Sequence, residues 1–172
     1  TFEAIPTAGC ANTFTIDCTS PITPTSATVA AATTTEVADG HIINKDSNKE
    51  LYYFIHIPDD GTYGITVVGS NHDKDQTLNI YSTDGALSGT VVYGGTTYTK
   101  KATFTANTTN SGQNQFYPIV ATTNLSLTEG DYIIGLNSIN SWSQFERIVA
   151  TGTFCEYHTL TLNSNNILFG TA

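Results

Sequence analysis

The chain has 172 residues, enough for one domain with a full hydrophobic core and too few for two domains of ordinary size. Six basic and 15 acidic side chains give a formal net charge of −9, and only 12% of the residues are charged. Nucleic acids and anionic membranes are bound through clustered lysines and arginines, so this balance argues against both as partners. No apolar run approaches the ~20 residues of a membrane span, and 39% hydrophobic residues argue against a disordered chain.

The first 35 residues have isolated apolar side chains set among threonine, serine, alanine and proline. Polar and apolar residues alternate along 13–18, as in a strand with one buried face, and Phe14 and Ile16 lie on that face. We therefore expect residues 1–35 to form an extended N-terminal arm, made of this strand and a Thr/Pro/Ala-rich linker. The arm would precede a single domain over 36–172.

From residue 36 onward, short apolar segments recur about every ten residues, separated by turn pairs such as Asp60-Gly61, Asp84-Gly85 and Glu129-Gly130. No window repeats apolar residues at helical spacing over three turns, so no substantial helix is expected. The sequence predicts an all-β fold, a single antiparallel β-sandwich of jelly-roll type. The expected strands are 41–44, 51–57, 62–68, 77–82, 90–93, 98–105, 115–122, 125–128, 131–137, 145–151, 153–162 and 166–169. Two hairpins would each place three alternate side chains on a common core: Tyr63, Ile65 and Val67 in one, and Tyr132, Ile134 and Leu136 in the other.

The strand–turn–strand pattern of 51–82 and the hairpin at 125–137 resemble two families. One is the jelly-roll carbohydrate-binding modules of secreted glycosidases, and the other is the bacterial pre-peptidase C-terminal domains. The resemblance covers about half of the chain and includes no catalytic signature. It implies a fold, since a pattern of this kind transfers fold far better than function.

Motifs of catalysis are absent from the sequence, among them the nucleophile elbow, the zinc-protease motif and the phosphate-binding loop, so we expect no enzyme activity. Oxygen-bearing side chains alternate in the loop 71–75, where Asn71, Asp73 and Asp75 could ligate Ca²⁺. A solvated turn explains that loop equally well. No other cofactor is expected.

The single tryptophan, Trp142, lies in the polar segment 140–144. An exposed aromatic ring in such a loop can stack on a sugar ring. Tyr93 and Tyr98, which flank the Gly94-Gly95 turn, would extend that platform. The alternative is that Trp142 folds onto the core.

Three cysteines, Cys10, Cys18 and Cys155, allow one disulfide. A strand over 13–17 would hold Cys10 and Cys18 roughly 25 Å apart, whereas a disulfide needs Cα atoms within about 7 Å. We expect Cys18–Cys155, because Cys18 shares the face of Phe14 and Ile16, with Cys10–Cys155 as the alternative. A disulfide fits an exported protein.

Other features also indicate export. The sequence has no methionine and begins with no apolar leader, which we interpret as a leader already removed. Asn107 and Asn124 head glycosylation sequons. We expect the protein to be extracellular or displayed on the cell surface.

Two functions fit this description. The first is a structural subunit of an extracellular filament, a homopolymer in which Phe14 and Ile16 of each arm donate a strand to the next copy. The second is an extracellular carbohydrate-binding module, a monomer that binds glycans through Trp142 and the nearby tyrosines.

Overall fold

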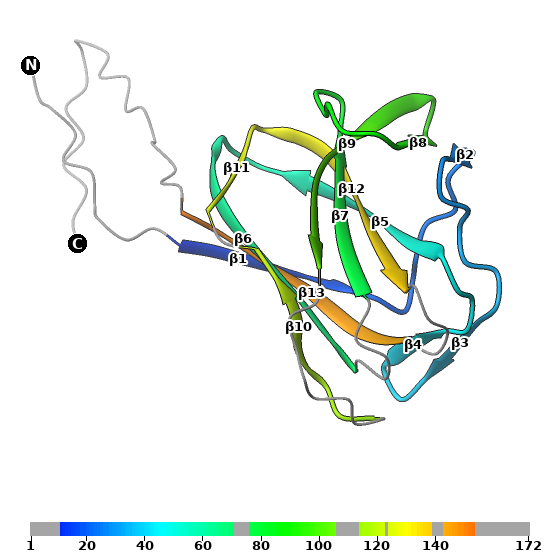
Figure 1. The fold of residues 1–172 in the computed structure, drawn as a ribbon. Helices are drawn as coiled ribbons and strands as arrows, with labels where there is room; N and C mark the ends of the chain where they lie inside the picture. Colours follow the sequence, from blue (N-terminus) through cyan, green and yellow to red (C-terminus); the bar gives the residue numbers. More distant parts are fainter. Residues whose placement is uncertain (1–10, 71–75, 106–113, 123, 139–142, 154–172) are drawn as a thin grey trace, which may run out of the picture.

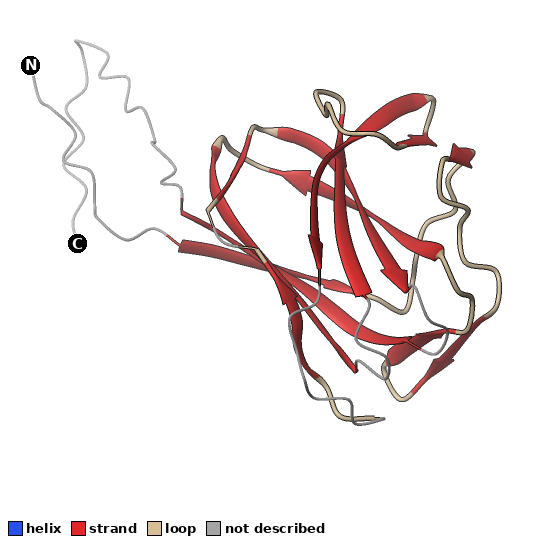
Figure 2. Ribbon diagram, viewed as in Figure 1, coloured by secondary structure: helices blue, strands red, loops and turns tan. Residues whose placement is uncertain are grey.

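The computed structural model describes residues 11–70, 76–105, 114–122, 124–138 and 143–153 (Figure 1). These segments contain thirteen strands and no helix, so the all-β prediction is confirmed (Figure 2). Accordingly, no helix in them is long and apolar enough to cross a membrane. The strands form two antiparallel sheets, which pack as a jelly-roll-like sandwich.

Sheet A has seven strands, with β13 (Ser143–Thr153) near its centre. One edge of β13 pairs with β6 (Gly61–Ser70), and the other edge pairs first with β4 (His41–Asn44) and then with β1 (Ala11–Asp17). The remaining strands are β3 (Thr35–Ala38) beside β4, and β10 (Tyr117–Ala121) and β11 (Leu125–Leu127) beside β6.

Sheet B has six strands in the spatial order β2-β8-β9-β7-β12-β5. Their bounds are Ser26–Ala27 for β2, Thr90–Tyr93 for β8, Thr96–Thr105 for β9, Gln76–Ser82 for β7, Gly130–Ser138 for β12 and Lys49–Ile57 for β5. The strands β7 and β12 are inside the sheet, and each pairs with a neighbour on both sides: β7 with β9 and β12, and β12 with β7 and β5.

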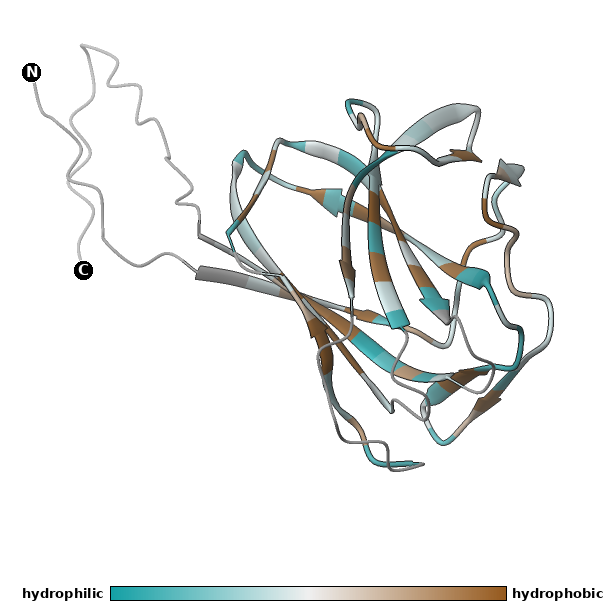
Figure 3. Ribbon diagram, in the orientation of Figure 1, coloured by the Kyte–Doolittle hydropathy of each residue, from teal (hydrophilic) through white to brown (hydrophobic). Residues whose placement is uncertain are grey.

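The core between the sheets follows the alternation of side chains along each strand. The two predicted sets of three, one on β6 and one on β12, are buried in it as expected. Apolar and polar bands alternate along the strands in Figure 3. On β13 the register shifts between Phe145 and Arg147, a β-bulge that lets Phe145 and Ile148 both face the core despite their odd spacing.

The predicted strand of the arm is present as β1, but it pairs with β13 of its own chain. Phe14 lies opposite Ala150 and Ile16 opposite Ile148, and both side chains pack against the chain's own core. The expectation that Phe14 and Ile16 enter a neighbouring copy is therefore wrong. The physical reason is the length of β13, which runs beyond its short partner β4 and leaves an edge that β1 fills.

Residues 19–34 pair with the free edge of β5 and, through β2, with β8, so the rest of the arm also packs on its own domain. The backbone N–H of Ile22 donates to the carbonyl of Tyr52, and that of Ala32 donates to the carbonyl of Glu50. Beneath this segment a second apolar cluster includes Tyr52, Tyr81, Val91, Tyr98 and Ile133.

Cys18 follows β1 directly and is a buried free thiol, and burial raises its pKa to about 12. Its backbone N–H donates to the carbonyl of Glu146, seven residues before the end of β13 at Thr153. Those seven residues of strand span roughly 23 Å. Cys155 is only two residues beyond Thr153, which is about 7 Å of chain at most. The structure thus contradicts the Cys18–Cys155 bridge. Cys10 and Cys155 lie outside the described residues, so the alternative pairing stays a prediction.

The other expected strands are present with small shifts of their ends, except where the chain is not described. Residues 154–162 and the expected strand 166–169 lie outside the described residues. Two strands were not predicted, β2 and β3. Both are short and mostly exposed, so they lack the buried alternation that marks a strand in sequence.

Candidate functional site

A gap opens in sheet B where its central strand β7 ends before its two neighbours. The last residue of β7, Ser82, pairs with Thr99 of β9, and the preceding Tyr81 pairs with Ile133 of β12. Three residues of each neighbour, 96–98 and 130–132, continue past this point. β7 instead turns away through Thr83 and Asp84, so the two neighbouring strands face each other across the space where β7 would have continued.

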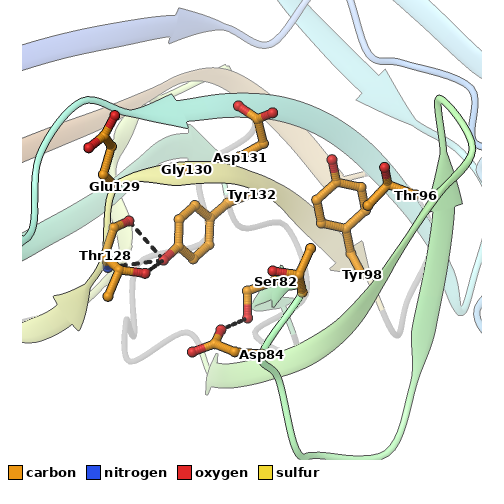
Figure 4. A pocket seen from close by; sticks show the side chains of 10 residues that line it. Ser82, Asp84, Thr96, Tyr98, Thr128, Glu129, Gly130, Asp131 and Tyr132 are labelled. Carbon is orange, nitrogen blue, oxygen red and sulfur yellow. Dashed lines mark hydrogen bonds between the residues drawn. The ribbon is translucent and has the colours of Figure 1, made fainter.

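This gap is a pocket of about 370 Å³, a size suited to a small ligand (Figure 4). Three segments line it: the turn after β7, the start of β9, and the turn that leads into β12. The lining residues are Ser82, Thr83, Asp84, Thr96, Tyr98, Thr128, Glu129, Gly130, Asp131 and Tyr132. Figure 4 shows the rings of Tyr98 and Tyr132 on opposite sides of Ser82.

Tyr132 forms a rigid wall of the pocket. Its ring is buried in the core, and its hydroxyl donates to the carbonyl of Thr128 at 3.0 Å. The same hydroxyl accepts the backbone N–H of Thr128 at 3.1 Å, which closes the turn into β12. Because these bonds lie within one turn, the ring and the turn are held as a unit.

Tyr98 forms the opposite wall and belongs to the outer apolar cluster. Burial raises the pKa of its phenol, and the nearby carboxylate of Asp131 raises this pKa further. Tyr98 is only 4% exposed, so the prediction that it forms an open stacking platform is wrong. It contributes a wall of the pocket instead.

Carboxylates surround the opening. Asp84 accepts a hydrogen bond from the Ser82 hydroxyl at 2.6 Å and pairs with Lys101 at 2.8 Å, and these contacts hold the pKa of the Asp84 carboxyl below its usual range. Asp131 contacts Nδ1 of His56, directly across the β12–β5 ladder, at 2.7 Å. Glu129 is the third carboxylate and is exposed. The pocket thus presents carboxylates and hydroxyls above two largely buried tyrosine rings, a polar lining suited to hydrogen bonding with a polyhydroxylated ligand.

The second predicted tyrosine, Tyr93, lies outside the pocket. It ends β8 and packs against Phe54 of β5, with ring centroids 5.9 Å apart and an interplanar angle of 47°. Phe54 is 39% exposed, so this pair gives the outer face of sheet B an accessible aromatic surface. Trp142 lies outside the described residues.

Most of the other predicted sites lie outside the described residues and stay predictions. Asn71, Asp73 and Asp75 lie outside the described residues, and the residues that are described contain no group of three or more His, Cys, Asp or Glu side chains arranged to hold a metal. Asn107 also lies outside them. Asn124 is exposed, with a φ of 54°.

The sequence pointed to the pocket only indirectly. Asp84-Gly85 and Glu129-Gly130 are visible in it as turn pairs at strand ends. These two turns lie close together only because of the register in which β7 pairs with β9 and β12. That register depends on residues far apart in the sequence, so no local pattern reveals it. Phe54 and His56 were also missed, because they alternate with core residues on an apparently ordinary strand.

Comparison with solved structures identifies the same fold in known proteins. One is the C-terminal CBM6 of LamC, a marine laminarinase from Zobellia galactanivorans, with a TM-score of 0.50 and 16% identity over 81% of this chain and 99% of that one. Another is the carbohydrate-binding module CBM6cm-2 from Cellvibrio mixtus lichenase 5A, in complex with cellotriose. Its TM-score is 0.52 and its identity 17%, over 82% of this chain and 98% of that one.

At these identities the likeness concerns the fold alone, and it confirms the resemblance to jelly-roll carbohydrate-binding modules at that level. No family model matches the sequence. No curated protein matches it significantly.

Proposed function

We propose that this protein is an extracellular, non-catalytic carbohydrate-binding module that binds a glycan in the pocket at the end of β7. The observation that carries the proposal is the pocket itself: two tyrosine walls joined by a rim of carboxylates and hydroxyls. The hydroxyls of a sugar can donate to these carboxylates and exchange hydrogen bonds with these hydroxyls, so the rim matches the polar edge of a glycan. Two proteins that share the fold are carbohydrate-binding modules, one of them in complex with cellotriose, which adds support.

The filament alternative loses its structural basis, because the strand meant for donation is used within the chain. Its two inward side chains are already packed on their own core. We therefore expect the protein to be a monomer that binds glycans.

The test is retention of the protein on immobilised cellulose, laminarin, xylan, mannan, galactan and chitin. We expect retention on at least one of these glycans and about tenfold weaker binding by Asp84→Asn, because Asp84 contributes a carboxylate to the pocket rim. Glu36→Gln is the matched control. Like Asp84, Glu36 is an exposed carboxylate paired with a lysine, but it lies on β3 of sheet A.

Retention on none of the six glycans would refute the proposal. Equal binding by Asp84→Asn and the wild type would place the glycan elsewhere. Measured activity toward a retained glycan would contradict the non-catalytic assignment.

A further inference from the structure

We propose that the ligand is a linear glycan of at least three sugar units, which leaves the pocket past Asp131 and lies on the aromatic surface formed by Phe54 and Tyr93. This inference rests on the proposed function and names the form of its ligand. Its argument is the continuity of the pocket with an exposed aromatic face on the same sheet.

The first step is the shared residue. Asp131 lines the pocket, and its carboxylate also contacts His56 on the outer face of β5. The side chains of His56 and Asp131 are each about half exposed, so this pair is accessible from solvent. It forms a polar bridge from the pocket to the neighbouring strand.

The second step follows β5. Phe54 is two residues from His56 on the same face, which corresponds to about 7 Å along a strand. Tyr93 approaches the same place from β8 and packs on Phe54. Val91, two residues before Tyr93 on β8, pairs directly with Tyr98 of the pocket wall, so the two tyrosines lie close together in one hairpin. Pocket, bridge and aromatic surface thus form one continuous path.

The path ends at Phe54, where segment 19–34 begins to cover β5. Beyond Phe54 the next outward residue of β5 is Tyr52, which is fully buried and donates a hydrogen bond to the carbonyl of Val29 in the covering segment 19–34. Phe54 is left 39% exposed at the border of this cover. An aromatic face beside a pocket can add contact area for a ligand that extends out of it. The path is therefore long enough for a short oligosaccharide and closed at one end.

The experiment uses the glycan retained by the protein in the panel above, as a series of soluble oligosaccharides of two to six units, with affinities measured by calorimetry. We expect the affinity to rise with length up to about four units and then to level. Phe54→Ala should weaken binding of the longer oligosaccharides about tenfold, which is about 1.4 kcal/mol, and leave the shortest one unchanged. Phe54→Tyr should restore the affinity, because it keeps an aromatic face.

The matched control is Val37→Ala. Val37 is the more exposed residue, at 57%, and lies on β3 of sheet A, so it tests whether losing any exposed apolar side chain matters. We expect this variant to bind like the wild type at every length.

The outcomes are separable from those of the proposed function. An affinity independent of length, or Phe54→Ala binding like the wild type, would overturn the inference while leaving the pocket as a glycan site. If Phe54→Ala lowered the affinity for short and long oligosaccharides equally, the inference would also be overturned, because Phe54 would then affect binding in the pocket itself. Absence of retention on every glycan of the panel would refute the proposed function itself.

Discussion

Replacement of Gly135 by alanine should reveal how the outer face of sheet B is held together. Glu50 of β5 is fully buried, and its carboxylate reaches across β12 to the far strand β7. There it accepts hydrogen bonds from Nδ2 of Asn79 at 2.6 Å and from the hydroxyl of Tyr81 at 2.8 Å. Gly135 is the residue of β12 that it crosses. A Cβ there would collide with Oε2 of Glu50 and lie 3.0 Å from the ring of Tyr81.

The magnitude follows from the bonds that must break. A net hydrogen bond to a charged group contributes roughly 1.5–3 kcal/mol. The Glu50 carboxylate can move away from the new Cβ of residue 135 only if it breaks at least one of these hydrogen bonds. Gly135→Ala should therefore lower the free energy of unfolding by about 1.5–3 kcal/mol. In the background Glu50→Ala the closest obstacle is gone, and the Tyr81 ring, no longer bonded to Glu50, can shift by the few tenths of an ångström that the Cβ needs. There Gly135→Ala should be neutral or stabilising by up to about 1 kcal/mol, because alanine loses less backbone entropy than glycine on folding.

The assay is urea denaturation of the wild type, the two single variants and the double variant, which together form a double-mutant cycle. Gly64→Ala is the control. A Cβ at Gly64, also a strand glycine, would meet its nearest neighbour at an ordinary 3.5 Å, so little change is expected. If the two changes are additive within 0.5 kcal/mol, the crossing of β12 by Glu50 does not constrain Gly135, and the reasoning fails.

Two further predictions concern the covering segment and the cysteines. Backbone N–H groups of Thr34 and Thr33 hold the pKa of the Asp46 carboxyl well below its usual range, so its contribution to stability is full at neutral pH, declines below about pH 4 and is lost only as the pH falls through the lowered pKa. Asp46→Asn should therefore differ from the wild type most in urea denaturation at pH 7 and by a smaller amount at pH 3. An equal difference at both pH values would contradict this. Because Ala11 pairs with Thr153, Cys10 and Cys155 are close enough along the chain to form a disulfide, and peptide mapping without reduction should recover that pair, with Cys18 alkylated only after unfolding; recovery of Cys18 in a disulfide would contradict the register argument.

Much of the fold could be predicted from the sequence because burial on a strand repeats every second residue. That rule placed the three inward side chains of β6 and of β12 correctly, and it found β1 from six residues. It failed for β2 and β3, whose side chains are mostly exposed and carry no such pattern. Local alternation therefore predicts a strand only where one of its faces is buried.

The site could not be predicted in the same way, since it depends on where strands stop relative to one another. Aromatic side chains next to a glycine turn suggested an exposed platform, but Tyr98 is buried in an apolar cluster that residues 19–34, distant in sequence, complete. The partner of β1 is a similar case. Phe14 and Ile16 alternate identically whether the strand pairs within the chain or with a neighbour, and only the free edge of β13 decides between them.

The arm and the pocket follow from one feature of this sandwich, strands of unequal length lying side by side. On sheet A, β13 is longer than β4, and the part of its edge that β4 leaves unpaired pairs with β1 of the same chain. On sheet B, β9 and β12 extend beyond the end of β7. No strand of the described residues occupies the space between them, because the chain turns away after Ser82. Segment 19–34 covers the face at Tyr52 and stops short of Phe54. The difference in length between β13 and β4 contributes to stability, because β1 pairs its backbone there and buries apolar side chains. The gap beyond the end of β7 remains open beside carboxylates and an exposed aromatic pair, and it is therefore this surface, and not the edge of sheet A, that we propose for the ligand.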